Sequence, residues 1–121
     1  MNKMIFVVDD NDANLTVAAL ALEADYRVLT MPSAERMFLL LEKKRPDLIL
    51  LDIEMPEMNG FDAISKLKEN ENLKDIPVMF ITGYIDDAVR SKAMGSGALD
   101  VLNKPIKPEA LLSRIKDYFE N

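Results

Sequence analysis

The chain of 121 residues contains neither cysteine nor histidine. Without cysteine it can form no disulfide and no thiolate metal site, and it has no thiol for covalent chemistry. Without histidine it has no imidazole to serve as a base, a nucleophile or a metal ligand. These two absences exclude thiol chemistry, histidine-based catalytic triads and most zinc sites.

An excess of basic residues is also lacking. The sequence has 15 lysines and arginines against 21 aspartates and glutamates, a formal net charge of −6. An acidic domain without a basic stripe is a poor nucleic-acid binder, so we expect no direct contact with nucleic acid. The apolar run Met4–Val8 is too short for a signal peptide and ends in two acids. No segment is long enough to span a bilayer, and we expect a cytoplasmic protein with no membrane contact.

Length and composition are those of one globular domain. Hydrophobic residues make up 49% of the chain and charged residues 30%, which is ordinary for a packed fold. We expect a single domain over residues 1–121, with a core of its own. The chain ends with its last predicted helix, which fits a domain that stands alone; an N-terminal fragment of a larger protein would end in the same way.

Short apolar runs recur along the chain and are typical of buried strands. The second run is less uniformly apolar than the others, which favours an edge position in the sheet. The predicted strands are Met4–Val8, Tyr26–Leu29, Leu48–Leu51, Val78–Ile81 and Leu99–Leu102.

Helical patterns alternate with these strands. Asp12 and Ser33 are candidate N-caps of the first two helices. Gly60 begins the third helix, the fourth covers about Asp86–Met94, and Pro108 suits the first turn of the last. Five strands alternating with five helices predict an α/β fold with a doubly wound parallel sheet. At this size we expect the flavodoxin-like strand order 2-1-3-4-5.

The stretch Leu48–Gly60 organises the chain. Its apolar run leads into Asp52, and Pro56 and Gly60 then interrupt regular structure. Taken alone, Asp52 is equally consistent with a residue that only caps a turn. However, polar residues follow other strands as well, and the carboxyl ends of parallel strands share one edge of the sheet. The residues expected to gather there are Asp9, Asp10, Asp52, Thr82 and Lys104.

This combination suits the transfer of a phosphoryl group. Three neighbouring carboxylates repel one another, and Mg²⁺ would relieve that repulsion. Thr82 supplies a hydroxyl donor and Lys104 a positive charge, which together can neutralise phosphoryl oxygens while a carboxylate attacks in line. An ionised carboxylate needs no general base, so the lack of histidine does not matter. Each residue alone is more often structural, but their convergence at one edge favours a site.

The motifs Asp9-Asp10, Asp52-Ile-Glu54-Met-Pro56, Thr82-Gly83 and Lys104-Pro105 resemble those of the receiver domain of two-component response regulators. The resemblance covers the whole chain. It implies that Asp52 accepts a phosphoryl group from a phosphohistidine, and that Thr82 and Lys104 contact the phosphoryl oxygens.

The same resemblance implies a metal site and partners. Asp10, Asp52 and the backbone carbonyl of Glu54 would bind Mg²⁺ directly, and Asp9 would act mainly through water. The phosphoryl donor would be a sensor histidine kinase or a phosphotransfer protein, and phosphorylation would shift the surface that binds a downstream protein which the sequence does not name. We expect a monomer or a weak phosphorylation-dependent dimer. Such a domain is not an enzyme beyond its own phosphorylation and slow dephosphorylation.

Two further features follow from the resemblance. It implies a cis peptide bond between Lys104 and Pro105. It also marks a departure, because many receivers carry an aromatic residue three positions before the lysine, where this chain has Val101. Valine is short and stiff about its single side-chain torsion, so we expect muted coupling to the partner surface. Tyr84 is a candidate to take the place of the missing aromatic residue.

Other classes of protein share some of these features. Asp10, Asp12 and Asn14 match the first ligand positions of a calcium-binding EF-hand loop, but Leu15 stands at the glycine position, so we reject that reading. A flavin-binding flavodoxin would share the fold, but no phosphate-binding loop rich in glycine, serine and threonine follows the first strand. A phosphatase of the haloacid dehalogenase type uses similar groups, but here the acidic pair precedes the nucleophile and the chain is too short for a substrate cap. A protein-binding module that is not phosphorylated is a third alternative.

Overall fold

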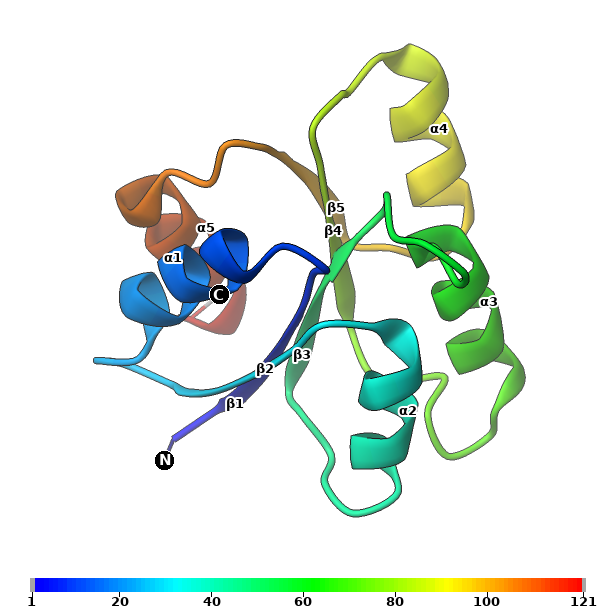
Figure 1. Cartoon of the computed structure of the whole chain (residues 1–121), viewed down its shortest axis with the longest axis horizontal. Coiled ribbons are helices and arrows are strands. Elements are labelled where there is room, and N and C mark those ends of the chain that lie inside the picture. The colour runs from blue at the N-terminus through cyan, green and yellow to red at the C-terminus, as the bar shows by residue number, and fades with distance from the viewer. Residues whose placement is uncertain (1, 121) are drawn as a thin grey trace.

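The computed structural model describes residues 2–120, and within them five parallel strands and five helices alternate (Figure 1). The strand order is β2-β1-β3-β4-β5, which confirms the predicted flavodoxin-like topology. The strands are β1 (Met4–Val8), β2 (Arg27–Met31), β3 (Leu48–Asp52), β4 (Val78–Thr82) and β5 (Asp100–Asn103). The helices are α1 (Asp12–Leu22), α2 (Ala34–Leu41), α3 (Gly60–Glu69), α4 (Asp87–Gly95) and α5 (Pro108–Glu120).

Helices cover both faces of the sheet. In Figure 1, α1 and α5 lie on one face, and α2, α3 and α4 lie on the other. Every residue of β3 and β4 is buried, as expected for central strands with neighbours on both faces. Side chains alternate along each strand, so the sheet separates two apolar clusters. One cluster contains Phe6, Leu51 and Phe80, and the other contains Val7, Leu50 and Ile81.

Two predicted strands are shifted. The second begins at Arg27 rather than Tyr26 and continues past Leu29 to Met31. The sequence carries a signal for this, because the residue before Pro32 is restricted to extended backbone angles. The last strand is Asp100–Asn103 rather than Leu99–Leu102, and Leu99 is exposed.

One predicted helix cap is wrong. Asn11, not Asp12, is the N-cap of α1: its side chain accepts a hydrogen bond from the Asn14 N–H, and Asp12 is the first helical residue. Either residue type suits an N-cap, so the sequence leaves a one-residue ambiguity. The Ser33 cap of α2 is confirmed. Pro108 begins α5 as predicted.

The last two helices each bury few residues. On α5, Leu111 and Ile115 are buried and Phe119 is partly buried. On α4, Ala93 is buried and Ala88 is exposed. The chain leaves α4 through Gly97, whose φ of 99° favours glycine over residues with a Cβ. None of the helices in the described part combines the length and apolar character needed to cross a membrane.

Strand register brings the polar residues to one edge. Val8 pairs with Leu51, so Asp9 lies level with Asp52 at the next position. Asp52 pairs with Ile81, one residue before Thr82, and Thr82 pairs with Asn103, one residue before Lys104. The predicted convergence at the carboxyl edge is therefore built by the ladder itself.

Candidate functional site

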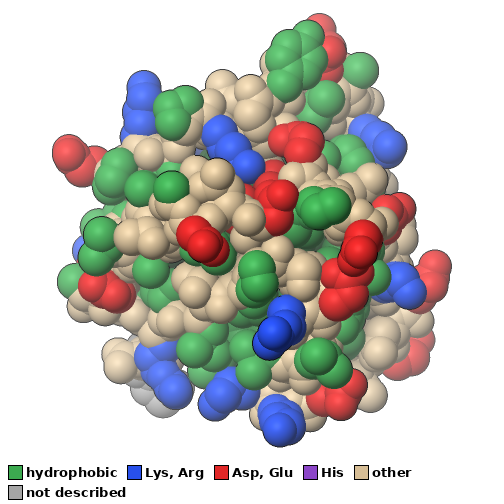
Figure 2. Space-filling view, viewed as in Figure 1, with side chains coloured by type: hydrophobic (Ala, Val, Ile, Leu, Met, Phe, Trp, Pro, Cys, Tyr) green, Lys and Arg blue, Asp and Glu red, His purple; other side chains and the backbone are tan. Residues whose placement is uncertain are grey.

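An acidic cluster of Asp9, Asp10 and Asp52 lies where β1 and β3 end. One carboxylate oxygen from each residue lies within 4.8 Å of the others. Asp9 and Asp52 are 1% and 0% exposed, whereas Asp10 is exposed. In Figure 2, acidic side chains lie in the upper centre of the view, over the region where these strands end in Figure 1. The cluster therefore combines two buried carboxylates with one that reaches solvent.

Asp52 has two inequivalent carboxylate oxygens. Its Oδ1 accepts the Lys104 ammonium at 3.0 Å and the Glu54 N–H at 3.2 Å. Among residues 2–120, Asp52 Oδ2 is the one buried side-chain polar atom that has no hydrogen-bond partner. Burial raises the pKa of Asp52 to about 6, against the lowering effect of Lys104, and the charge of Asp9 adds to the rise. A buried oxygen without a partner is costly unless a ligand engages it.

Asp9 is held from several sides. Its Oδ1 accepts the Asn11 N–H at 2.9 Å, and its Oδ2 accepts the Asn14 side-chain amide at 3.2 Å and the Lys104 ammonium at 3.2 Å. The sequence reasoning missed Asn14, whose signal is its place in the first turn of the helix that follows the acidic pair. Asp10, by contrast, makes no hydrogen bond or ion pair with the part of the chain described here, so its carboxylate is available to a ligand.

Lys104 joins the two buried acids. Its side chain is 19% exposed, and its ammonium contacts both Asp9 and Asp52. Burial alone would lower the pKa of Lys104, but the bonds from Asp52 and Asp9 outweigh it, so the pKa is raised. The Lys104 N–H donates to the Thr82 carbonyl at 2.8 Å, which fixes the end of β5 to the end of β4. The Lys104–Pro105 peptide bond is cis, as the resemblance implies.

Thr82 is fully buried, and its hydroxyl is not free. It donates to Glu54 Oε2 at 2.5 Å, and it accepts the Tyr84 N–H at 3.3 Å. The other Glu54 oxygen, Oε1, accepts the Gly83 N–H at 3.2 Å. The sequence reasoning gave Glu54 a role only through its backbone carbonyl and so missed this side-chain contact. Nothing in the local spacing distinguishes it, because the partners are 28 and 29 residues apart.

The loop after Asp52 folds back tightly. The Gly60 N–H donates to the Ile53 carbonyl at 2.9 Å. A Cβ at Gly60 would lie 2.6 Å from the Asp52 carbonyl oxygen and 2.9 Å from the Ile53 Cα. Since both are backbone atoms, a larger residue would displace the end of β3. Gly60 therefore permits the close approach that positions Asp52 against the loop.

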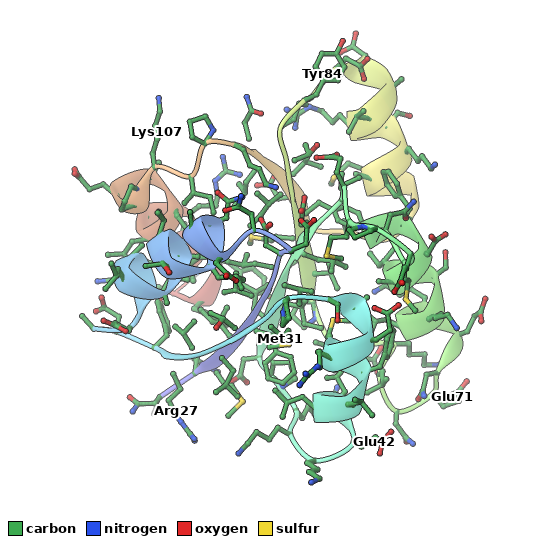
Figure 3. All side chains as sticks on the ribbon, viewed as in Figure 1. Arg27, Met31, Glu42, Glu71, Tyr84 and Lys107 are labelled. Carbon is green, nitrogen blue, oxygen red and sulfur yellow. The ribbon has the colours of Figure 1, made fainter. Side chains whose placement is uncertain are left out.

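A cavity of about 630 Å³ lies beside β5, between α4 and α5. Val101 and Ile85 supply apolar lining, and Arg90, Lys104 and Lys107 supply positive charge. Val101 is 4% exposed, and Tyr84 is 67% exposed. Figure 3 labels Tyr84 beside the start of α4 and Lys107 beside the start of α5. The aromatic ring of Tyr84 thus lies at the outer surface rather than in the position left by the missing aromatic on β5.

Comparison with known proteins identifies the family. The model of the response regulator receiver domain matches residues 5–116. The chain is 30% identical over 119 residues to the polar-differentiation response regulator DivK of Brucella abortus, covering 98% of this chain and 97% of DivK. It is 37% identical over 117 residues to the response regulator PleD of Caulobacter vibrioides, covering 96% of this chain. The chain spans only 26% of the length of PleD, and the same share of a probable cyclic di-GMP phosphodiesterase of Vibrio cholerae to which it is also similar.

Solved structures agree with this result. The BeF3-activated receiver domain of DrrB superposes with a TM-score of 0.88 at 30% identity, and the match covers 100% of both chains. The chemotaxis protein CheY4 of Vibrio cholerae superposes with a TM-score of 0.90 at 25% identity, covering 97% of this chain and 98% of CheY4. The fold, the acidic cluster and these matches agree with one another. The chain belongs to the response regulator receiver domain family, whose members are two-component signalling domains rather than conventional enzymes.

Proposed function

We propose that Asp52 is the residue that accepts the phosphoryl group. The observation that carries this proposal is the state of its carboxylate, which is fully buried at the end of the central strand, has one oxygen on Lys104 and leaves Oδ2 without a partner. Of the acids in the cluster, Asp9 has both oxygens engaged and Asp10 is exposed. Asp52 alone combines burial with a free acceptor atom.

The reaction needs no proton transfer at Asp52. An oxygen of the carboxylate attacks phosphorus, and the new oxygen–phosphorus bond forms as the bond from phosphorus to the donor's histidine nitrogen breaks. The bonding electrons pass to that nitrogen. Lys104 and Thr82 would contact the phosphoryl oxygens and offset their negative charge. Lys104 lies 3.0 Å from Asp52, and Thr82 ends the neighbouring strand.

The donor set suits Mg²⁺. Hard carboxylate oxygens with access to water are the ligands this ion prefers, and Asp10 supplies an exposed carboxylate next to the free Asp52 Oδ2. We propose Asp10, Asp52 and the backbone carbonyl of Glu54 as direct ligands. Asp9 would act through water, because its own oxygens already accept protein donors. When bound, the ion would neutralise charge that develops on the phosphoryl oxygens.

The proposal extends to partners and context. Family membership implies a histidine kinase as donor, and we propose that a sensor kinase or a phosphotransfer protein fills this role, with a downstream protein as the receiver of the signal. We further propose one receiver domain over residues 1–121, acting as a monomer or a weak phosphorylation-dependent dimer. Because histidine kinases take their phosphoryl group from ATP, the proposal assigns the domain to the cytoplasm, with no nucleic-acid or membrane contact.

Mass measurement of the intact protein tests the acceptor. After incubation with a small-molecule phosphodonor and Mg²⁺, the wild type should gain one phosphoryl group, and Asp52→Asn should gain none, because an amide oxygen is a poor nucleophile. Asp12→Asn is the matched control, since Asp12 is an exposed acid in the nearby first turn of α1; it should be modified at the wild-type rate. Modification of Asp52→Asn at the wild-type rate would contradict the assignment.

A further inference from the structure

The Glu54 side chain lies across the end of β4 in the unphosphorylated domain. Its Oε2 takes the Thr82 hydroxyl at 2.5 Å, and its Oε1 takes the Gly83 N–H at 3.2 Å. Both oxygens of one carboxylate are therefore used on two consecutive residues of the β4–α4 connection. Hydrogen bonds to an ionised acceptor are shorter and stronger than neutral ones, and the Thr82 bond is at the short end of that range.

These two donors are of the kind that a phosphoryl oxygen would take. A hydroxyl and a backbone N–H at a strand end commonly bind anions, and the Glu54 N–H itself donates to Asp52 Oδ1 at 3.2 Å. A single short segment therefore connects the acceptor carboxylate to the Thr82 hydroxyl.

We propose that Glu54 is a resident anion that occupies Thr82 and Gly83 until a phosphoryl group on Asp52 displaces it. The inference rests on the proposed function of Asp52. It makes Glu54 a positioning residue: its side chain fixes the β4–α4 connection before phosphorylation and competes with the phosphoryl group for the Thr82 hydroxyl. This role is separate from that of its backbone carbonyl.

Burial determines which partner moves. Thr82 is 0% exposed and cannot turn to water, whereas Glu54 is exposed and can. A phosphoryl group on Asp52 adds negative charge beside the Glu54 carboxylate and repels it. The exchange therefore replaces one anion on Thr82 with another, and Glu54 passes into solvent. Part of the binding free energy of the phosphoryl group is used in this displacement, so its net affinity is lower than without Glu54.

Three variants separate the contact from the charge. Glu54→Gln removes the charge and leaves an amide that can accept at one position only. Glu57→Gln removes the same charge from the same loop, where Glu57 is exposed and makes no hydrogen bond or ion pair within residues 2–120. Glu54→Ala removes the contact completely and leaves the backbone carbonyl in place.

The experiment uses the full chain and amide NMR, first without ligand and then titrated with beryllium trifluoride in Mg²⁺. Without ligand, Glu54→Ala should move the Gly83 amide resonance. In the titration it should bind the mimic about tenfold more tightly than the wild type, the net gain expected when the charge-assisted hydrogen bonds to Glu54 no longer have to be broken. Glu54→Gln should lie between them. Glu57→Gln should stay within about twofold of the wild type, because an exposed charge is screened.

Each contrary outcome has a distinct meaning. An unmoved Gly83 resonance in Glu54→Ala would show that the contact is absent in solution and overturn the inference. Equal tightening by Glu57→Gln would reduce the effect to bulk charge, and weaker binding by Glu54→Ala would show that Glu54 assists the phosphoryl group; either overturns the competition. Failure of the wild type to bind the mimic would instead contradict the proposed function.

Discussion

Two sides of the same sheet edge differ in how firmly they are held. On one side the acidic cluster is fixed: Asp9 and Asp52 are buried, and both are bound to Lys104. On the other side, Thr82 is held by the exposed Glu54, and Val101 lines a cavity of about 630 Å³. The acidic cluster therefore holds its groups in place for phosphoryl transfer, whereas the side chains around Thr82 and Val101 have space in which to change conformation.

Strand alternation produces this division. Asp9 and Asp52 continue the face that carries Val7 and Leu50, toward α1 and α5. Thr82 continues the face that carries Phe80, in the cluster that also contains Val101, toward α3 and α4. On this second face, helix α4 contacts helix α3 through Lys92, whose ammonium lies 4.3 Å from the centre of the Phe61 ring. Substitutions on the two faces should therefore affect chemistry and response separately.

The largest effect should come from removing the exposed member of the acidic cluster. Asp10→Ala should weaken Mg²⁺ binding on the order of a hundredfold, because loss of one unit charge beside the ion costs several kcal/mol. Asp12→Ala should change it little, since Asp12 belongs to the first turn of α1. Calorimetric titration measures both. Equal losses of Mg²⁺ affinity in the two variants would mean that only the net charge of the region matters, and Asp10 would then have no special role in the cluster.

A second prediction concerns the cost of burying Asp52. Burial raises its pKa from the usual 3.8 to about 6. The folded state then binds the proton more tightly than the unfolded chain, so the associated stability is present below pH 4 and is lost as the pH rises through 6. Relative to Asp52→Asn, the free energy of unfolding of the wild type should fall by about 2 kcal/mol between pH 4 and pH 7.

Denaturant titration of both proteins in metal-free buffer measures this difference. Asp12→Asn serves again as the control, because an exposed carboxylate loses little solvation on folding. If the free energies of unfolding of the wild type and Asp52→Asn change in parallel with pH, burial of the Asp52 carboxylate carries no such cost. The contrast between the acidic cluster and the Thr82 side would then lose this support.

The same division explains how far the sequence could be read. The ends of the strands determine which residues reach the site, and continuous apolar runs mark those ends well; Asp9, Asp52, Thr82 and Lys104 lie where the runs predict. Side-chain contacts made by residues that follow the strands are not encoded in that pattern. The Asn14 amide on Asp9 and the Glu54 carboxylate on Thr82 depend on rotamers and on partners far apart in the sequence, so only the structure reveals them.

Boundaries were missed for a local reason. Asn11 and Asp12 have similar capping preferences, and only backbone angles choose between them: Asn11 is extended, with φ −101° and ψ 117°. The observed end of β2 lies beyond the predicted one because the apolar run stops at Leu29, although threonine favours strands and Pro32 restricts Met31 to extended angles. These errors leave the site unchanged, although the Met31 carbonyl does accept the Asp9 N–H at 3.2 Å.

The smallest expected effect lies on the side of Val101. Phosphorylation shifts a conformational equilibrium only through groups that pack differently in the two states, and valine is too small and stiff to differ much. Binding of beryllium trifluoride should therefore cause only modest amide shifts across α4 in the wild type. Val101→Tyr should enlarge them, because a tyrosine ring can occupy the adjacent cavity in one state and leave it in the other.

Tyr84 provides the control for this last prediction. It follows Thr82 by two residues, shares a backbone contact with its hydroxyl and is 67% exposed, so it is the one other aromatic placed to report the exchange at Thr82 within the described β4–α4 connection. If Tyr84 takes the place of the missing aromatic, Tyr84→Ala should reduce the α4 amide shifts further. Adding Val101→Tyr to Tyr84→Ala should restore them. Large α4 shifts that persist in Tyr84→Ala with Val101 intact would contradict both versions. They would mean that the β4–α4 backbone itself transmits the change, since neither the β5 position nor the exposed ring would then be needed.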